Sequence, residues 1–350
     1  MKSSVALGAF LVLGSVACGD GAGDPVTPDG GAQPDTGVLP DSGGNKDASV
    51  NDDSGNAPDA ASGDGTAPGQ HVKTVFLILM ENHNWKDIKG SASAPYINKT
   101  LLPTAAHAEN YFDNPKKIHP SEPNYIWLEA GDNLGITTDA DPSTNHLITG
   151  KDHLTKQLKA AGVPWRAYVE DITAGKCPLN SNGFYGAKHV PMVFFDDVVG
   201  SPPSATAPEC VANVVPYTQL AGDLTANKVA SYNFITPNIC DDMHGQAGCG
   251  ADLIKNGDTW LAAEVPKILA SQAYKDNGAL FITWDESEGG ESPIGMIVLS
   301  PLGKGAGFSN TTKYFHSSMV RTVETIFGIK TFLNDAANQP DLGDLFTAGL

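Results

Sequence analysis

The sequence predicts an α/β sandwich with a mostly parallel central sheet. An unbroken apolar run at residues 75–80 (VFLILM) and a second, mainly apolar one at 279–284 (ALFITW) are typical of strands that are buried on both faces. Stretches with helical spacing alternate with shorter strand candidates, which is the pattern of a sheet covered by helices. The 350 residues are enough for one large domain or two small ones.

The other elements follow from local patterns of apolar residues, glycine and proline. Shorter strands are expected at residues 165–169, 231–236 and 294–299. Helices are expected at residues 95–108, 154–161, 259–269 and 316–327. Another helix covers 126–130, and Pro123 at its first position would place Ser121 or Glu122 at its start. Residues 171–216 are rich in loops and aromatic side chains, so we expect an insertion near the functional site.

The first 70 residues differ from the rest of the chain. Residues 1–18 resemble a secretory signal, because Lys2 precedes an apolar stretch and small residues precede Cys18. A cysteine there resembles the lipidated cysteine of bacterial lipoproteins, although Ser15 occupies a position that is usually Leu. Lipid anchoring through Cys18 and simple secretion both remain open. Either one places the mature protein outside the cytoplasm.

Residues 19–70 form a Gly-, Asp- and Pro-rich segment without an aromatic residue, and we expect it to be a disordered linker before a domain at 71–350. The segment has ten Asp and one Lys, a net charge of −9 out of −18 for the whole chain. The acidity that remains is modest and gives no support to nucleic-acid binding, which requires basic patches. An acidic protein can still bind phosphorylated molecules where a metal supplies positive charge.

Four cysteines remain after Cys18, and an even number agrees with disulfide bonding in an oxidising compartment. Three pairings are open. The pairing between sequence neighbours, Cys177–Cys210 and Cys240–Cys249, is preferred. Zinc binding is the alternative, but these spacings do not match a zinc-ribbon pattern.

Pairs of oxygen-bearing side chains follow the two long apolar runs. Glu81 and Asn82 end the first run, and Asp285 and Glu286 end the second. Ligand sites of open α/β sheets lie beyond the carboxyl ends of the strands, so parallel strands would bring these four side chains together. Carboxylates crowded in this way repel one another unless a cation neutralises them, and hard oxygen donors suit a divalent metal. Two purely structural alternatives remain. The two pairs could lie on separate solvated loops, or Glu81 and Asn82 could cap a helix.

Ser121 is the candidate nucleophile, because it lies in a proline-framed turn at a predicted helix start. A serine hydroxyl needs a base or a metal for activation. The chain lacks a G-x-S-x-G elbow, a P-loop and a dinucleotide-binding fingerprint, so metal activation fits better than a hydrolase triad. A simple helix-capping role for Ser121 remains the alternative.

Acid–base candidates are Asp242 and His244, on a short loop between Cys240 and Cys249, and His316 at the start of the last helix. His119, two residues before Ser121, could also act or could stabilise the turn. We interpret the other histidines as surface or core residues: His71, His107, His146, His153 and His189.

Five motifs, in this order, resemble the phosphoesterase family of bacterial and fungal acid phosphatases and bacterial phospholipases C: MENHNW, HPSEPNY, PNICDDMHG, WDESEGG and FHSSMVRTVETIFG. The resemblance extends from about residue 73 to residue 329. It implies a fold similar to the alkaline phosphatase superfamily and a divalent metal. Family members often have Asp-Asp where this chain has Asp285 and Glu286. By this resemblance, the metal-ligand positions of the family correspond to Glu81, Asn82, Asp285 and Glu286. The nucleophile corresponds to Ser121, and the Asp-x-His segment corresponds to Asp242 with His244.

We therefore expect an exported, metal-dependent acid phosphatase that hydrolyses phosphate monoesters through a phosphoserine. Its partners would be a small phosphorylated substrate or a phospholipid headgroup, with membrane attachment through a lipidated Cys18 and no nucleic acid. The first alternative is a phospholipase C or another phosphodiesterase. A more distant alternative is a non-catalytic, calcium-binding surface lipoprotein, but pure binding would not require Ser121 or the histidines.

Overall fold

The computed structural model describes residues 71–350, and the predicted signal, Cys18 and linker lie outside them. Eight strands form one sheet in the order β4-β3-β5-β1-β6-β7-β2-β8. Strands β4, β3, β5, β1 and β6 are parallel, while β7 is antiparallel to both β6 and β2. The prediction of an α/β sandwich with a mostly parallel sheet is confirmed. The strands are β1 Thr74–Met80, β2 Ala106–Ala108, β3 Trp165–Val169, β4 Val214–Pro216, β5 Tyr232–Thr236, β6 Gly278–Trp284, β7 Met296–Leu299 and β8 Ser309–Asn310.

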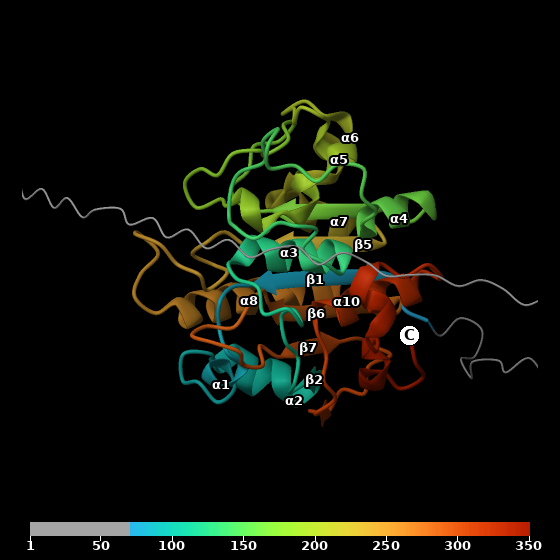
Figure 1. Cartoon of the computed structure of the whole chain (residues 1–350). Helices are drawn as coiled ribbons and strands as arrows, with labels where there is room; N and C mark the ends of the chain where they lie inside the picture. Colours follow the sequence, from blue (N-terminus) through green and yellow to red (C-terminus); the bar gives the residue numbers. More distant parts are fainter. Residues whose placement is uncertain (1–70) are drawn as a thin grey trace, which may run out of the picture. The chain divides into compact units, whose positions relative to one another are not determined.

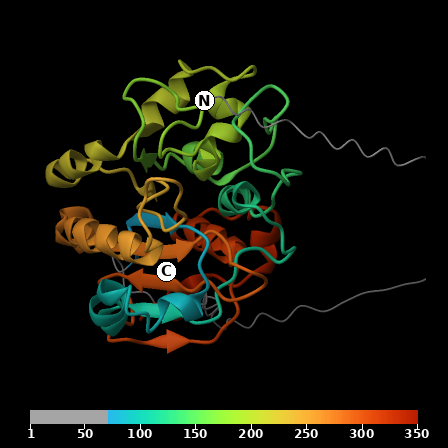
Figure 2. The ribbon, with the colours of Figure 1, turned by 90° about the vertical axis from the view of Figure 1, so that its left-hand side faces the viewer.

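Helices cover both faces of the sheet (Figures 1 and 2). Figure 2 shows α8 on one side of β1, with α3 and α10 on the other side. This enclosure explains why β1 and β6 have almost no polar side chain, since neither strand has a face in contact with water. The α-helices are α1 Trp85–Ile88, α2 Leu102–Thr104, α3 Ser121–Ala130, α4 Leu154–Ala160, α5 Asp196–Val199, α6 Pro208–Asn213, α7 Leu220–Ala226, α8 Leu253–Ala270, α9 Gln272–Lys275 and α10 His316–Ile326.

Short irregular helices complete the chain. They are the π-helical turn η1 Ile97–Leu101 and the 3₁₀ turns η2 Ala187–His189, η3 Pro191–Phe194, η4 Tyr217–Gln219, η5 Asn334–Asn338 and η6 Leu342–Leu345. None of the described helices is long and apolar enough to cross a membrane.

Three local expectations are wrong. A single helix at 95–108 is replaced by η1, α2 and the strand β2, because the backbone becomes extended at Ala105 and residues 106–108 pair with β7. Helix α3 begins at Ser121, so Pro123 is its third residue and not its first. The segment 171–216 belongs partly to the core and is not only an insertion, since its aromatic residues Phe194 and Phe195 are fully buried, although η2 within it does lie at the candidate site described below.

Both expected disulfides are present. Cys177 bonds to Cys210, and Cys240 bonds to Cys249. The second bond closes the loop that follows β5 and carries Asp242 and His244. The preference for pairing between sequence neighbours is confirmed.

Candidate active site

The carboxyl ends of β1 and β6 meet at one edge of the sheet. These strands are parallel neighbours, with Met80 opposite Trp284, so Glu81 and Asp285 lie side by side. Both are fully buried. The Asn82 amide donates to Asp285 Oδ1 at 2.9 Å, and the Asn82 side chain donates to Glu286 Oε1 at 3.1 Å. The structure therefore brings together all four residues that follow the two apolar runs.

Ser121 is the first residue of α3 and is almost completely buried. Its hydroxyl can donate to Glu81 Oε2 at 3.2 Å or to Glu286 Oε1 at 3.5 Å. An ordinary helix cap accepts a hydrogen bond from a backbone amide of its own helix, and Ser121 is not in the capping position of α3, which is occupied by Pro120. The serine instead faces the carboxylates at the sheet edge.

Asp242 enters the same cluster from the disulfide-closed loop after β5. It is fully buried, and the backbone carbonyl of Asp242 accepts a hydrogen bond from the Glu81 amide at 2.8 Å. The next residue, Met243, is also fully buried and has a φ of +83°, a conformation that costs free energy for a residue other than glycine. Because Met243 is packed in the core, it holds the backbone of this loop in place, and with it the neighbouring residues Asp242 and His244.

His244 is partly exposed and its backbone amide donates to Asp242 Oδ1 at 2.7 Å. Its ring is oriented by a 2.9 Å hydrogen bond from Nδ1 to the Gly245 carbonyl. The sequence correctly placed Asp242 and His244 near the cluster, on a loop that a disulfide closes.

His189, in η2, is the residue that sequence reasoning missed. It is buried, its Nε2 lies 3.1 Å from Glu81 Oε1, and its Nδ1 lies 3.4 Å from Asp242 Oδ2. Its ring stacks on Tyr125 of α3 at 5.0 Å between centroids. Our interpretation of His189 as an ordinary core or surface histidine is wrong, and no local sequence pattern links it to residues more than 50 positions away.

Glu286 differs from the other acidic residues because hydrogen-bond donors occupy both of its oxygens. Oε1 accepts from Asn82, and Oε2 accepts from Asn124 at 3.1 Å. His119 Nδ1 also donates to Oε2. Glu286 therefore holds His119 at the cluster. This position is compatible with the second role considered for His119, which is to stabilise the turn before Ser121.

His316 opens α10 as expected, but it lies behind the cluster. Its Nε2 donates to the Asp285 carbonyl at 2.6 Å, and Tyr111 donates to its Nδ1 at 3.2 Å. Burial lowers the pKa of His316 to about 4, so the ring is neutral. With both nitrogens occupied inside the protein, His316 positions the Asp285 backbone.

Burial is the main cause of the unusual pKa values of the cluster. It raises the pKa of Glu81 and Asp285 well above the ordinary range, and neighbouring carboxylates raise them further. Burial also raises the pKa of Asp242 and Glu286 to about 7. The pKa of His189 is well below its usual value, again mainly through burial. Carboxylates that are crowded together and shielded from water in this way would be stabilised by a cation bound between them.

The donor set fits a divalent metal. One ligand atom from each of Glu81, Asp242 and His189 can be chosen so that all three lie within 4.8 Å of one another. Oxygen and imidazole donors of this kind suit several divalent ions. The buried side-chain atoms of the cluster that lack a hydrogen-bond partner are Glu81 Oε1, Asn82 Oδ1, Asp242 Oδ2, Asp285 Oδ2 and both ring nitrogens of His189.

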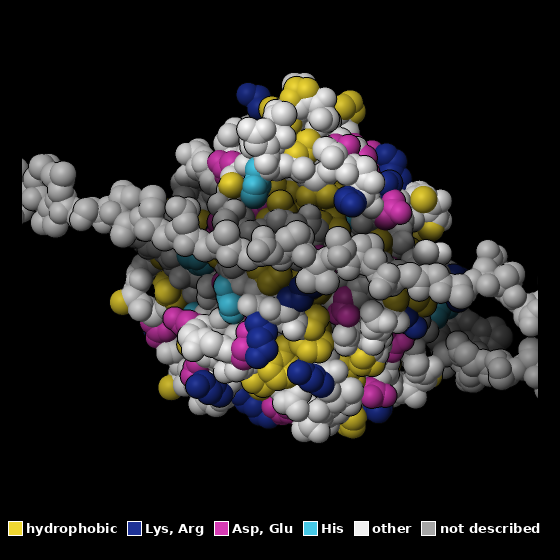
Figure 3. Space-filling model, in the orientation of Figure 1, with side chains coloured by type: hydrophobic (Ala, Val, Ile, Leu, Met, Phe, Trp, Pro, Cys, Tyr) yellow, Lys and Arg dark blue, Asp and Glu magenta, His cyan; other side chains and the backbone are white. Residues whose placement is uncertain are grey.

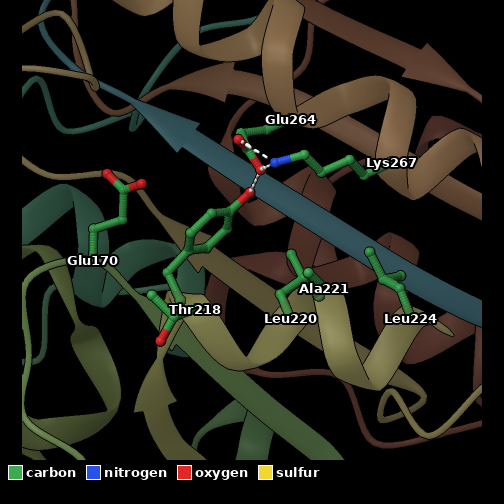
Figure 4. Close-up of a pocket in the computed structure, with 8 residues that line it drawn as sticks. Glu170, Thr218, Leu220, Ala221, Leu224, Glu264 and Lys267 are labelled. Carbon is green, nitrogen blue, oxygen red and sulfur yellow. Dashed lines mark hydrogen bonds and ion pairs between the residues drawn. The ribbon is translucent and has the colours of Figure 1, made fainter. Parts of the chain in front are cut away.

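A separate pocket of about 340 Å³ lies between η4, α7 and α8 (Figure 4). Its charged side chains are already paired, since Glu264 accepts hydrogen bonds from Tyr217 and Lys267. No residue of the Ser121 cluster lines it. The crowded carboxylates and the Ser121 hydroxyl lie outside this pocket, so the candidate active site is the cluster.

Curated relatives support a phosphoesterase. The chain is 28% identical over 274 residues to a phosphatidylinositol-3-phosphatase of Mycobacterium tuberculosis, covering 78% of this chain and 82% of that protein. It is 25% identical to a probable acid phosphatase of Kluyveromyces lactis and to an acid phosphatase of Aspergillus fumigatus, each over 73% of this chain. The matches span only 58% and 54% of these two fungal proteins.

Solved structures share the fold. A protein of the alkaline phosphatase superfamily from Vibrio parahaemolyticus matches 79% of this chain and 72% of its own, with a TM-score of 0.52 and 10% identity. A phosphonate monoester hydrolase from Silicibacter pomeroyi matches 79% of this chain and 77% of its own, with a TM-score of 0.51 and 11% identity. The expected alkaline phosphatase-like fold is confirmed.

The profile of the Phosphoesterase family matches residues 106–330, which is well over half of the chain. That range includes Ser121, His189, Asp242 and Asp285, while Glu81 and Asn82 precede it. Together with the acid phosphatase relatives, this match identifies the protein as a member of the Phosphoesterase family and a hydrolase acting on phosphoric ester bonds.

Proposed function

We propose that the protein is an exported, metal-dependent phosphatase that hydrolyses phosphate monoesters through a phosphoserine at Ser121. The observation that carries this proposal is the buried Ser121 hydroxyl within hydrogen-bond reach of Glu81 and Glu286. In the same cluster, one side-chain oxygen each of Glu81, Asn82, Asp242 and Asp285 has no hydrogen-bond partner. Glu81, Asn82, Asp242, Asp285 and His189 would hold the cation. Such a cation supplies positive charge that neutralises the carboxylates and favours loss of a proton from a nearby hydroxyl.

The residues of the chain perform the chemical steps. Ser121 Oγ attacks phosphorus, the bond from phosphorus to the leaving oxygen breaks, and the serine proton passes to a neighbouring carboxylate. His244, the partly exposed imidazole beside Asp242, would protonate the leaving oxygen. Water then attacks this phosphorus and the bond from phosphorus to Ser121 Oγ breaks, which releases phosphate. The proton that water loses passes to His244, and the carboxylate returns its proton to Oγ. Glu286 with His119 orients Ser121, and His316 fixes the backbone of Asp285.

The substrate class is a small phosphate monoester or the phosphate of a lipid headgroup. The relative from Mycobacterium tuberculosis is a phosphatidylinositol-3-phosphatase that aligns over most of both chains, and this favours a phosphoinositide headgroup among the candidates. Nucleic acid is not a proposed partner, and Lys and Arg are interspersed with Asp and Glu on the face that Figure 3 shows. A phospholipase C or other phosphodiesterase activity is the alternative.

Export is supported by the two disulfides, since such bonds persist in oxidising compartments. The signal at residues 1–18, the linker at 19–70 and lipid attachment at Cys18 remain part of the proposal. The described residues 71–350 would be the phosphoesterase domain.

Substitution of Ser121 by Ala tests the proposal. Turnover of p-nitrophenyl phosphate should fall at least about a thousandfold, or roughly 4 kcal/mol of barrier, while folding and metal content are preserved. Assays with and without chelator, and with bis(p-nitrophenyl) phosphate and phosphatidylcholine, separate the monoesterase from the alternatives. A folded, metal-loaded Ser121→Ala variant with normal turnover would exclude the serine as nucleophile.

A further inference from the structure

We propose that Lys188 is the phosphate-binding cation of this site and that it makes the site prefer phosphate monoesters to diesters. Lys188 is one residue before His189, in η2, and its side chain is about one-fifth exposed. The inference rests on the proposed function, because it assigns the substrate preference of the same site. Nothing in the five sequence motifs pointed to this residue.

A chain of hydrogen bonds holds the Lys188 ammonium at the start of α3. Nζ donates to Asp139 Oδ2 at 2.7 Å. The other oxygen of Asp139 accepts from the Glu122 amide at 3.0 Å, and Glu122 directly follows Ser121. The N-terminal end of a helix attracts anions, and Lys188 adds a full positive charge beside it.

The charge of Lys188 also reaches the carboxylates of the cluster. Although burial raises the pKa values of Glu81, Asp242 and Glu286, the field of Lys188 opposes that rise in all three. Lys188 nevertheless forms its ion pair with Asp139, outside the cluster. The placement of Lys188 rests on geometry, because Asp139 joins its ammonium to the Glu122 amide, one residue after Ser121. The ion pair that Lys188 forms is with Asp139, which is not a proposed metal ligand.

The ammonium has donors to spare for a substrate. An ammonium has three N–H donors, and within residues 71–350 the hydrogen bond found for Lys188 is the one to Asp139. About one-fifth of the Lys188 side chain is exposed to solvent. A phosphoryl oxygen at the start of α3 can thus accept a charge-assisted hydrogen bond from Nζ.

A fixed positive charge distinguishes the two ester classes. A monoester dianion presents three non-bridging oxygens and two negative charges, whereas a diester presents two oxygens and one charge. Lys188 interacts more strongly with the dianion, and the second ester group of a diester replaces one acceptor oxygen. Because preorganised charge contributes most where charge accumulates in the transition state, loss of Lys188 should harm monoester hydrolysis selectively.

The test compares Lys188→Gln, Lys188→Arg and Asp139→Asn with the full-length wild type. Lys159→Gln is the matched control, since Lys159 forms an exposed ion pair with Glu209 on the helix surface, at 2.6 Å. The measurements are kcat/KM for p-nitrophenyl phosphate and bis(p-nitrophenyl) phosphate, the calorimetric Kd of inorganic phosphate, metal content and Tm.

We expect Lys188→Gln to lower kcat/KM for the monoester by about a hundredfold, as removal of one transition-state donor does, and to change the diester value less than tenfold. The phosphate Kd should rise at least tenfold, with unchanged metal content and Tm. Lys188→Arg should recover most of the monoester activity. Asp139→Asn removes the carboxylate that positions the ammonium, so it should raise the phosphate Kd by less than Lys188→Gln does. Lys159→Gln should leave all of these measurements unchanged.

An equal loss for both substrates, or no loss for either, would overturn the assignment. Failure of the proposed function has a different signature. If the wild type hydrolyses neither substrate, the proposed function fails, and the phosphate Kd values of the wild type and Lys188→Gln still test the role of Lys188. Phosphate that binds the wild type and Lys188→Gln equally, or binds neither, rejects the role of Lys188 as a phosphate-binding cation.

Discussion

Asp242→Asn should make the metal-free protein more stable while it removes activity. Asn has almost the shape of Asp, and its carbonyl oxygen can still accept the 2.7 Å hydrogen bond from the His244 amide. The substitution thus deletes one buried negative charge. It also replaces Oδ2, which has no hydrogen-bond partner and lies 3.4 Å from His189 Nδ1, by an amide group that can donate to this ring nitrogen. In the metal-free cluster that charge is repelled by its neighbours and is poorly solvated, so its loss is favourable.

The magnitude follows from the pKa of Asp242, which burial raises from 3.8 to about 7. A carboxyl group with a raised folded pKa destabilises the fold as the pH rises above the unfolded pKa, and the cost is complete above the folded pKa. Three pKa units correspond to about 4 kcal/mol at about 1.4 kcal/mol each. The other carboxylates share this cost, so we expect Asp242→Asn to recover about 2–3 kcal/mol at pH 8 and almost nothing at pH 4.

The assay is urea denaturation in the presence of chelator at pH 4 and pH 8, repeated with a saturating divalent metal. The wild type should gain more stability from the metal than the variant gains, because the variant has lost one proposed ligand. An Asp242→Asn variant that is less stable than the wild type at pH 8 in chelator would refute the view that the cluster is electrostatically strained without a cation.

Two further predictions concern the loop and the linker. Replacement of both Cys240 and Cys249 by Ser should cost about 2–3 kcal/mol of stability in the chain-entropy account. Activity should fall more than stability, because the bond closes the loop that carries Asp242 and His244; unchanged kcat would contradict this. Deletion of residues 19–70 should leave Tm and kcat nearly unchanged, since the segment has few apolar residues to pack on a core, and a large drop in Tm would show that it is structural.

The sequence predicted the parts of the structure that depend on local pattern. The two apolar runs became the neighbouring parallel strands β1 and β6, and the polar residues that follow them met at one sheet edge because parallel strands share an orientation. The prediction put Pro123 at the first position of this helix with Ser121 or Glu122 at its entrance, and the observed helix α3 begins at Ser121, with Pro123 as its third residue.

Features that arise from long-range packing could not be predicted in this way. His189 reaches Glu81 and Asp242 only because η2 packs against α3, and no spacing in the sequence encodes that contact. The saturated hydrogen bonding of Glu286 depends on Asn124, three residues beyond Ser121 on α3. Residues 95–108 have helical apolar spacing, but tertiary pairing with β7 draws their last part into the sheet.

Trapping the covalent intermediate tests the central claim most directly. The wild-type protein, loaded with metal, would be mixed with a phosphate monoester whose non-bridging phosphoryl oxygens carry a stable heavy isotope. The reaction would be quenched in acid within milliseconds, and the protein would be digested for mass spectrometry. Labelled phosphate should appear on the peptide that contains Ser121, and none should appear in the Ser121→Ala variant. Active enzyme that turns over the substrate without labelling Ser121, or that labels a different residue, would rule out a phosphoserine at Ser121.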